Sequence, residues 1–214
     1  MPSPASSPES TTLRTIFLDR DGVLNRKLPE GQFVTRPGEF HLLPGVPQAI
    51  ARLNRAGLRV LLVSNQRGIA LGRYTANDVH AIHASLQREL AMHSAHVDAF
   101  YFCPHDRAAS GQVPRQDVSS ESEPACDCRK PLPGLYHQAR ADFPDIAPES
   151  SLMIGDSLSD IEFGRGLGMA TIFIQGDPTH QKPGADRARS LANQSFASLP
   201  EAVDFILNRL QTKS

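Results

Sequence analysis

Short apolar runs alternate with longer helical patterns along this chain, and this alternation limits the folds that it can adopt. Strands are expected at Thr15–Leu18, Leu58–Val63, Ala99–Phe102, Ser151–Ile154 and Ala170–Ile174. Helices are expected at Val46–Arg55, from the capping residue Thr75 to about His93, and at Pro133–Phe143, Leu158–Leu167 and Leu199–Leu210. The alternation predicts an α/β fold in which a doubly wound parallel sheet has helices on both faces.

Composition excludes several classes of partner. The length of 214 residues fits one domain, and 40% hydrophobic residues suffice for a sizeable core. A net charge of −1, without a basic cluster, argues against nucleic acid, and no apolar run approaches the length of a membrane span. The Pro/Ser/Thr-rich residues 1–12 lack the features of a signal peptide. We therefore expect a disordered leader at 1–12, a single domain at 13–214, a monomer and a cytoplasmic location.

The sequence Asp-Arg-Asp-Gly directly follows the first expected strand. Residues two apart in an extended chain point to the same side, so Asp19 and Asp21 are expected to face one ligand. Asp19 could attack phosphorus as a covalent nucleophile, and Asp21 could serve as the general acid and base around an aspartyl-phosphate. Gly22 would let the backbone turn sharply beside the ligand. The plainer interpretation is a solvated loop, because pairs of aspartates are common.

Polar residues also follow the second strand and precede the third helix. Ser64, Asn65 and Gln66 stand where a hydroxyl and loop N–H groups can hold phosphate oxygens. Arg129 and Lys130 stand just before a helix N-terminus, which suits an anion. Each group has an ordinary alternative, since polar residues commonly end strands and basic pairs are commonly solvated.

A third carboxylate, Asp156, directly follows the fourth expected strand. Mg²⁺ prefers oxygen ligands, and Asp19, Asp156 and the backbone carbonyl of Asp21 would supply them. Asp156 and Asp160 could equally cap the helix that follows. Ligands on parallel sheets bind at the carboxyl ends of the strands, so all four polar groups are expected to converge there.

All three cysteines of the chain lie in the motifs Cys-Pro-His and Cys-Asp-Cys. Three thiolates and an imidazole make a closed, structural zinc site, whose ligands would be Cys103, His105, Cys126 and Cys128. A disulfide would leave one cysteine over, and three unrelated thiols would not explain the nearby histidine. Zinc in the loop 103–128 would fix the direction of the basic pair that follows it.

The order and content of these motifs resemble the haloacid dehalogenase superfamily of phosphatases, from about Thr15 to Gln175. The combination is similar to the D-glycero-D-manno-heptose 1,7-bisphosphate 7-phosphatase family. This resemblance implies a Rossmann-like fold without a cap domain, and Mg²⁺-dependent hydrolysis of the 7-phosphate of that small phosphorylated sugar. It implies the following roles: Asp19 as nucleophile, Asp21 as acid and base, Ser64 and Lys130 as phosphoryl ligands, Arg129 in substrate recognition, and Asp160 in orienting its motif.

Three features depart from that family. The polar segment after His105 is longer than expected, Phe33 replaces an expected tyrosine, and Ser157 stands where many relatives have a basic residue. The last two concern substrate recognition. A histidinol-phosphate phosphatase, whose family has the same zinc loop, and a non-catalytic binding module of the same fold remain alternatives. A dinucleotide-binding dehydrogenase is disfavoured, because the glycine cluster at 164–168 ends a helix instead of following a strand.

Overall fold

The computed structural model describes residues 12–29, 31–106, 126–176 and 183–212. In this part of the chain, six parallel strands form one sheet with the order β3-β2-β1-β4-β5-β6. The strands are β1 (Thr15–Leu18), β2 (Arg59–Asn65), β3 (Ala99–Cys103), β4 (Ser151–Gly155), β5 (Ala170–Ile174) and β6 (Gln194–Phe196). The predicted α/β fold with a parallel sheet is confirmed.

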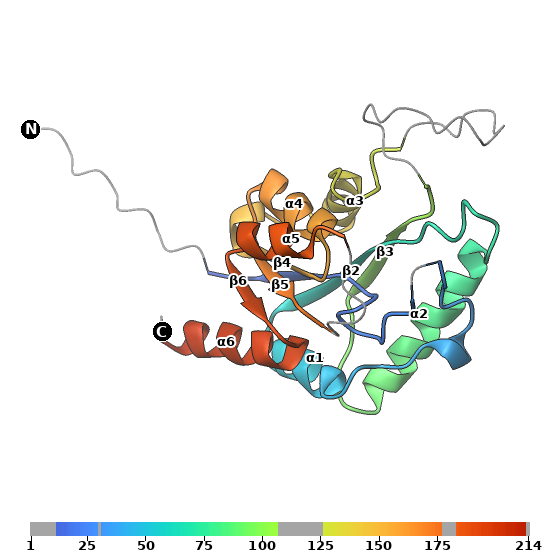
Figure 1. The fold of residues 1–214 in the computed structure, drawn as a ribbon. Helices are drawn as coiled ribbons and strands as arrows, with labels where there is room; N and C mark the ends of the chain where they lie inside the picture. The colour runs from blue at the N-terminus through green and yellow to red at the C-terminus, as the bar shows by residue number, and fades with distance from the viewer. Residues whose placement is uncertain (1–11, 30, 107–125, 177–182, 213–214) are drawn as a thin grey trace, which may run out of the picture.

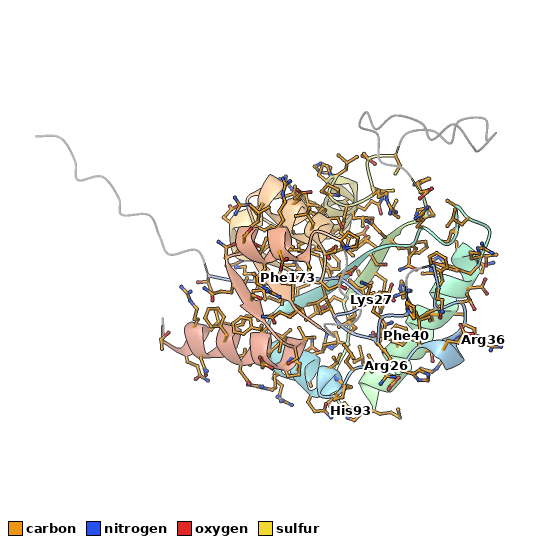
Figure 2. The ribbon with its side chains drawn as sticks, in the orientation of Figure 1. Arg26, Lys27, Arg36, Phe40, His93 and Phe173 are labelled. Carbon is orange, nitrogen blue, oxygen red and sulfur yellow. The ribbon has the colours of Figure 1, made fainter. Side chains whose placement is uncertain are left out.

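Helices cover both faces of this sheet (Figure 1). They are α1 (Val46–Arg55), α2 (Ala76–Ala91), α3 (Gly134–Asp142), α4 (Leu158–Leu167), α5 (Ala185–Leu191) and α6 (Leu199–Gln211). Helices α1, α2 and α6 pack on the face that carries Ile16 and Leu18, whereas α3 and α4 pack on the face that carries Phe17. Helix α5 packs with α4 around Phe173 (Figure 2). Because β1 is central, its four residues are buried.

The observed elements follow the predicted ones closely, with two omissions. Strands β1 and β5 have the predicted bounds, and β2 extends further than expected, through Ser64 and Asn65, which pair with β3. The short elements α5 and β6 were not predicted. Strand β6 has three residues and none is buried, so it lacks the alternation that signals a strand.

Helix α2 begins as the sequence indicates. The Thr75 hydroxyl accepts from the backbone N–H of Asp78 at 3.2 Å, and the Asp78 carboxylate accepts the Thr75 backbone N–H at 2.8 Å. This reciprocal pair satisfies donors that the first turn of a helix leaves unpaired. The helix ends at Ala91, two residues before the expected end.

Between β1 and α1 the described chain adds only a loop and a 3-10 turn, Pro37–Glu39. The absence of a cap domain and the single-domain division stay predictions. The expected leader, except Thr12, and the polar segment at 107–125 lie outside the described residues. None of the helices in the described part of the chain combines the length and the apolar character that a lipid bilayer requires.

Candidate active site

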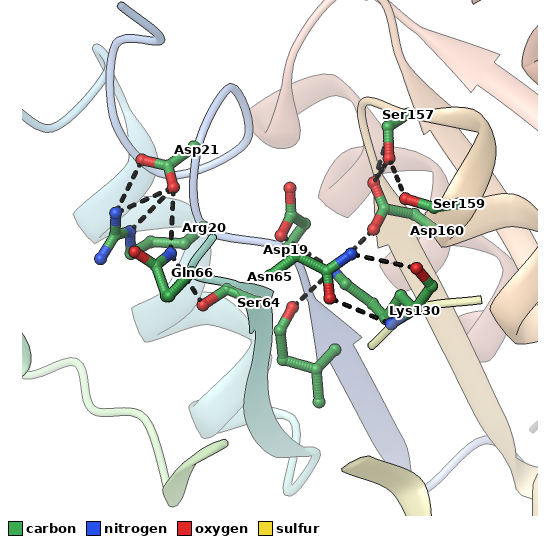
Figure 3. A network of polar contacts seen from close by, with 11 residues as sticks. Asp19, Arg20, Asp21, Ser64, Asn65, Gln66, Lys130, Ser157, Ser159 and Asp160 are labelled. Carbon is green, nitrogen blue, oxygen red and sulfur yellow. Dashed lines mark hydrogen bonds and ion pairs between the residues drawn. The ribbon is translucent and has the colours of Figure 1, made fainter. Parts of the chain in front are cut away.

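The carboxyl ends of three neighbouring strands bring the predicted site residues together. Leu18 at the end of β1 lies opposite Leu62 of β2 and Ile154 of β4. The next residue, Asp19, continues the ladder, since its backbone N–H donates to the carbonyl of Ile154 at 2.9 Å. The side chains that follow these strands therefore gather at one edge of the sheet (Figure 3).

Lys130 lies at the centre of this group. Its Nζ is 2.8 Å from Asp19 Oδ1 and 2.6 Å from Asp160 Oδ1, and it donates to the carbonyl of Val63 at 2.7 Å. The side chain is 1% exposed. Burial alone would lower the pKa of Lys130, but the charges of Asp160 and Asp19 outweigh burial and raise the pKa above its usual range. Lys130 is therefore a fixed ammonium beside Asp19.

The segment that carries Lys130 is held by the end of β2. The Asn65 side chain donates to the carbonyl of Lys130 at 3.1 Å and accepts its N–H at 3.0 Å. Asn65 was predicted to bind phosphate. In the structure both polar atoms of its side chain contact the Lys130 backbone and hold the segment that carries this cation, and phosphate binding by Asn65 stays a prediction.

Asp160 contributes one oxygen to the site and one to its own helix. Its Oδ2 accepts the backbone N–H of Ser157 at 3.0 Å and the Ser157 hydroxyl at 2.6 Å, which caps α4. Its Oδ1 contacts Lys130. The capping alternative is thus confirmed for Asp160, and the same side chain also contacts Lys130; its expected role in orienting its motif stays a prediction.

Asp21 makes contacts on the other side of the loop. Its carboxylate accepts hydrogen bonds from the side chains of Arg20, Asn25 and Gln66. The Gln66 Nε2 also lies 3.1 Å from the Ser64 hydroxyl, and Gln66 is 1% exposed. Gln66 was predicted as a phosphate ligand, and the structure places it as a buried link between Ser64 and Asp21.

Gly22 allows the loop to approach Asp156. Its φ is +96°, in the region that favours glycine, and a Cβ there would collide with the Asp156 carboxylate. Asp156 is buried at 8% exposure, with Lys27 Nζ 4.0 Å from its Oδ2. The sharp turn predicted at this glycine is confirmed.

The carboxylates of Asp19, Asp156 and Asp160 form a cluster that fits a hard cation. One oxygen from each lies within 4.8 Å of the others, and all three residues are buried. Oxygen donors of this kind suit Mg²⁺. The expected ligands Asp19 and Asp156 belong to this cluster, whereas the carbonyl of Asp21 stays a prediction.

The predicted zinc ligands converge as well. The Sγ atoms of Cys103 and Cys126 are 3.7 Å apart, and His105 Nδ1 is 3.5 Å from Cys103 Sγ and 3.3 Å from Cys128 Sγ. A tetrahedron with Zn–S bonds of about 2.3 Å has S–S edges of about 3.8 Å, so the spacing fits. Burial raises the pKa of the Cys103 and Cys128 thiols, and a bound cation would keep them as thiolates.

Arg129, which was predicted to recognise the substrate, and Phe33, which replaces an expected tyrosine, lie beside the site. The Arg129 Nη1 donates to the carbonyl of His105 at 2.9 Å, which ties the guanidinium to the Cys/His cluster. Phe33 lies against Tyr74, with ring centroids 5.9 Å apart, in a cleft of about 180 Å³ that Asp21 and Gln66 also line.

A second cavity opens on the other side of the Asp-Arg-Asp-Gly loop. Its volume is about 600 Å³, and Gly22, Asp156 and Gln175 line it together with Arg26 and Lys27. Figure 2 labels these two basic residues. Lys27 also lines the cleft beside Phe33. An anionic substrate would therefore meet a cation on this side of the loop.

Comparison with known proteins shows what the chain resembles. The D-glycero-alpha-D-manno-heptose-1,7-bisphosphate 7-phosphatase of Mycobacterium tuberculosis is 35% identical over 186 residues, which cover 87% of each chain. The chain belongs to the heptose bisphosphate 7-phosphatase family of the haloacid dehalogenase superfamily. The D-glycero-beta-D-manno-heptose-1,7-bisphosphate 7-phosphatase of Bordetella bronchiseptica is 38% identical over 76% of this chain and 81% of that protein. The HAD-hydrolase-like family model matches residues 127–209.

The fold agrees with this family. The crystal structure of D,D-heptose 1,7-bisphosphate phosphatase from B. bronchiseptica, complexed with magnesium and phosphate, matches 92% of this chain and 99% of that one. Its TM-score is 0.72 at 31% identity. The family assigned from the sequence motifs, and the phosphomonoester hydrolase class that goes with it, are therefore confirmed.

Sequence reasoning missed two polar residues that contact the site. Arg20 reads as a surface charge between two aspartates, yet it is 2% exposed. Its position offered a signal, since a residue between two that face the ligand points the other way, toward the core. Tyr74, whose hydroxyl donates to Gln66 Oε1 at 2.7 Å, precedes the α2 cap and carries no such signal.

Proposed function

We propose that the protein hydrolyses the 7-phosphate of D-glycero-D-manno-heptose 1,7-bisphosphate through an aspartyl-phosphate on Asp19. The observation that carries this proposal is the position of Asp19, buried at the end of the central strand beside the Lys130 ammonium and two further carboxylates. Relatives named for this reaction cover most of the chain, which supports the choice of substrate.

The chemistry divides into two displacements. In the first, an Asp19 oxygen forms a bond to phosphorus as the bond to the sugar oxygen breaks, and Asp21 gives its proton to that oxygen. In the second, water attacks phosphorus, Asp21 takes its proton, and the bond to Asp19 breaks. Lys130 and the Ser64 hydroxyl would bind the phosphoryl oxygens throughout. Bound Mg²⁺, held by Asp19 and Asp156, would neutralise charge on the phosphoryl group.

We propose zinc as the occupant of the Cys/His cluster, with a structural role. Four ligands would close its coordination sphere, which leaves no position for a substrate. Its effect would pass through Arg129, which hydrogen-bonds to the carbonyl of His105. The three cysteines are free thiols in the structure, which fits the proposed cytoplasmic location.

Phosphate release from a panel of substrates tests the proposal. The panel contains both anomers of heptose 1,7-bisphosphate, histidinol phosphate, and common hexose monophosphates, each with Mg²⁺. We expect the highest kcat/KM for a heptose bisphosphate, and no turnover by the near-isosteric Asp19→Asn variant. A preference for histidinol phosphate would refute the substrate, and turnover by Asp19→Asn would refute the mechanism.

A further inference from the structure

Arg20 is a buried cation that the two-step chemistry leaves without a role. It stands between Asp19 and Asp21, and its side chain is 2% exposed. Its Nε lies 3.2 Å from Asp21 Oδ2, and its Nη2 lies 3.1 Å from Oδ1 and 2.9 Å from Oδ2. Figure 3 shows the guanidinium against the Asp21 carboxylate. The planar guanidinium of Arg20 therefore donates hydrogen bonds to both oxygens of the Asp21 carboxylate.

The surroundings of Arg20 hold it in place. Its Cζ lies 5.9 Å from the ring centroid of Phe40. Its backbone carbonyl accepts the N–H of Leu24 at 2.9 Å, which closes the turn around Gly22. In the described part of the chain, Nη1 has no hydrogen-bond partner. Within the described residues, this buried cation forms its ion pair with Asp21, at 2.9 Å from Nη2 to Oδ2.

Two neutral amides also contact Asp21. Asn25 Nδ2 donates to Oδ1 at 3.0 Å, and Gln66 Nε2 lies 3.3 Å from Oδ2. Tyr74 in turn donates to Gln66 at 2.7 Å, and burial raises the pKa of Tyr74 to about 12, so its hydroxyl keeps the proton that it donates. The Asp21 side chain remains 30% exposed, so part of it faces the open side of the site.

We propose that Arg20 is a positioning residue for the general acid and base of this reaction. The inference rests on the proposed function. Arg20 acts through Asp21 and touches no reacting atom. When Asp21 gives its proton to the leaving sugar oxygen, it becomes a carboxylate, and the guanidinium stabilises that charge and fixes its direction. The same carboxylate then takes a proton from the attacking water in the second step.

The magnitude follows from the cost of misplacing an acid. General acid–base catalysis contributes about 10²–10⁴-fold, and a displacement of about 1 Å can cost about 10²-fold. We therefore expect Arg20→Met to lower kcat on the sugar phosphate by about 10²-fold, with KM changed by less than about threefold. Arg20→Lys keeps the positive charge but lacks the planar pair of donors that contacts both carboxylate oxygens. Its kcat on the sugar phosphate should therefore fall about 10-fold.

A double-mutant cycle tests whether Arg20 acts through Asp21. Each Arg20 variant is made in the wild type and in the Asp21→Asn variant, with circular dichroism spectra recorded to verify the fold. In the Asp21→Asn background we expect either substitution to change kcat by less than about threefold, because the group that Arg20 positions is already lost. Equal losses in both backgrounds would overturn the proposal and leave Arg20 a merely structural residue.

A second readout uses the leaving group. p-Nitrophenolate leaves without a proton, so single-turnover release of p-nitrophenol should fall less than about threefold in Arg20→Lys, while release of the sugar falls about 10-fold. Equal losses for the two substrates would contradict the proposal. Should Arg20→Met fail to fold, the Arg20→Lys cycle decides alone. Full activity of Asp21→Asn would instead refute the proposed mechanism. The double-mutant cycle can be measured with any sugar phosphate that the enzyme hydrolyses.

Discussion

His83 should make the stability of this protein fall in mild acid. It lies on the inner side of α2, 4% exposed and stacked on Phe100 with ring centroids 4.7 Å apart. Neither ring nitrogen has a hydrogen-bond partner among the described residues. Burial, helped by the nearby charge of Arg20, lowers the pKa of His83 from 6.5 to about 3. The native state therefore holds this imidazole neutral.

The sign and size of the effect follow from proton linkage. Between pH 6.5 and about 3 the unfolded chain binds a proton at His83 that the native state does not. The stability that the neutral His83 contributes is therefore fully present above pH 6.5, and it is lost as the pH falls through this window. At pH 4.5, two units below the unfolded pKa, the loss is about 2.7 kcal/mol.

Urea unfolding followed by circular dichroism at pH 7.5 and pH 4.5 measures this loss. His83→Met replaces the ring with an apolar side chain, and should lose about 2.7 kcal/mol less than the wild type between the two pH values. Other groups titrate in both proteins, so the difference isolates His83. The exposed His80, one turn earlier on α2, gives the matched control His80→Met, which keeps the buried His83 ring and should therefore keep most of the loss. Equal losses in wild type and His83→Met would refute the argument.

Three further changes address the site. Lys130→Met should destabilise the Mg²⁺-free protein by about 3 kcal/mol in thermal unfolding, because buried carboxylates lose their cation; added Mg²⁺ should restore part of this. Cys126→Ser should lower the zinc content, from about one per chain by elemental analysis, and reduce kcat. Arg129→Ala should lower kcat/KM for the bisphosphate roughly 10- to 150-fold, and less for p-nitrophenyl phosphate, as a lost charge-assisted contact implies; equal losses would mean that Arg129 serves the reacting phosphate.

The sequence predicted best what depends on local pattern. Strand β1 is a continuous apolar run bounded by Asp19, and both its limits were found, because a strand buried on two faces has no polar interruption. The cysteine cluster was also predictable, since ligand type and number restrict the metal. Strand β6 was missed because an edge strand of three residues has neither a continuous apolar run nor an alternation of apolar and polar residues.

The roles of the amides depended on tertiary contacts that no local pattern records. Asn65 ends β2 and Gln66 follows it, yet their partners are the Lys130 backbone and the Asp21 carboxylate, 65 and 45 residues away along the chain. For Arg20, the alternation along an extended chain indicated only that the side chain points inward, whereas its contacts with Asp21 and Phe40 depend on the fold. Chemistry could be assigned from residue type, whereas positioning required the fold.

The central place of β1 bears on how the site responds to partial opening of the molecule. Asp19, the proposed nucleophile, follows a strand that is hydrogen-bonded on both edges, to β2 and to β4. Amide protons of such a strand exchange with solvent only when most of the sheet separates, whereas those of the edge strand β6 exchange in smaller openings. Deuterium uptake at Ile16 and Phe17 should therefore be among the slowest in the chain. Local opening of the edge strand β6 would therefore leave the position of Asp19 unchanged.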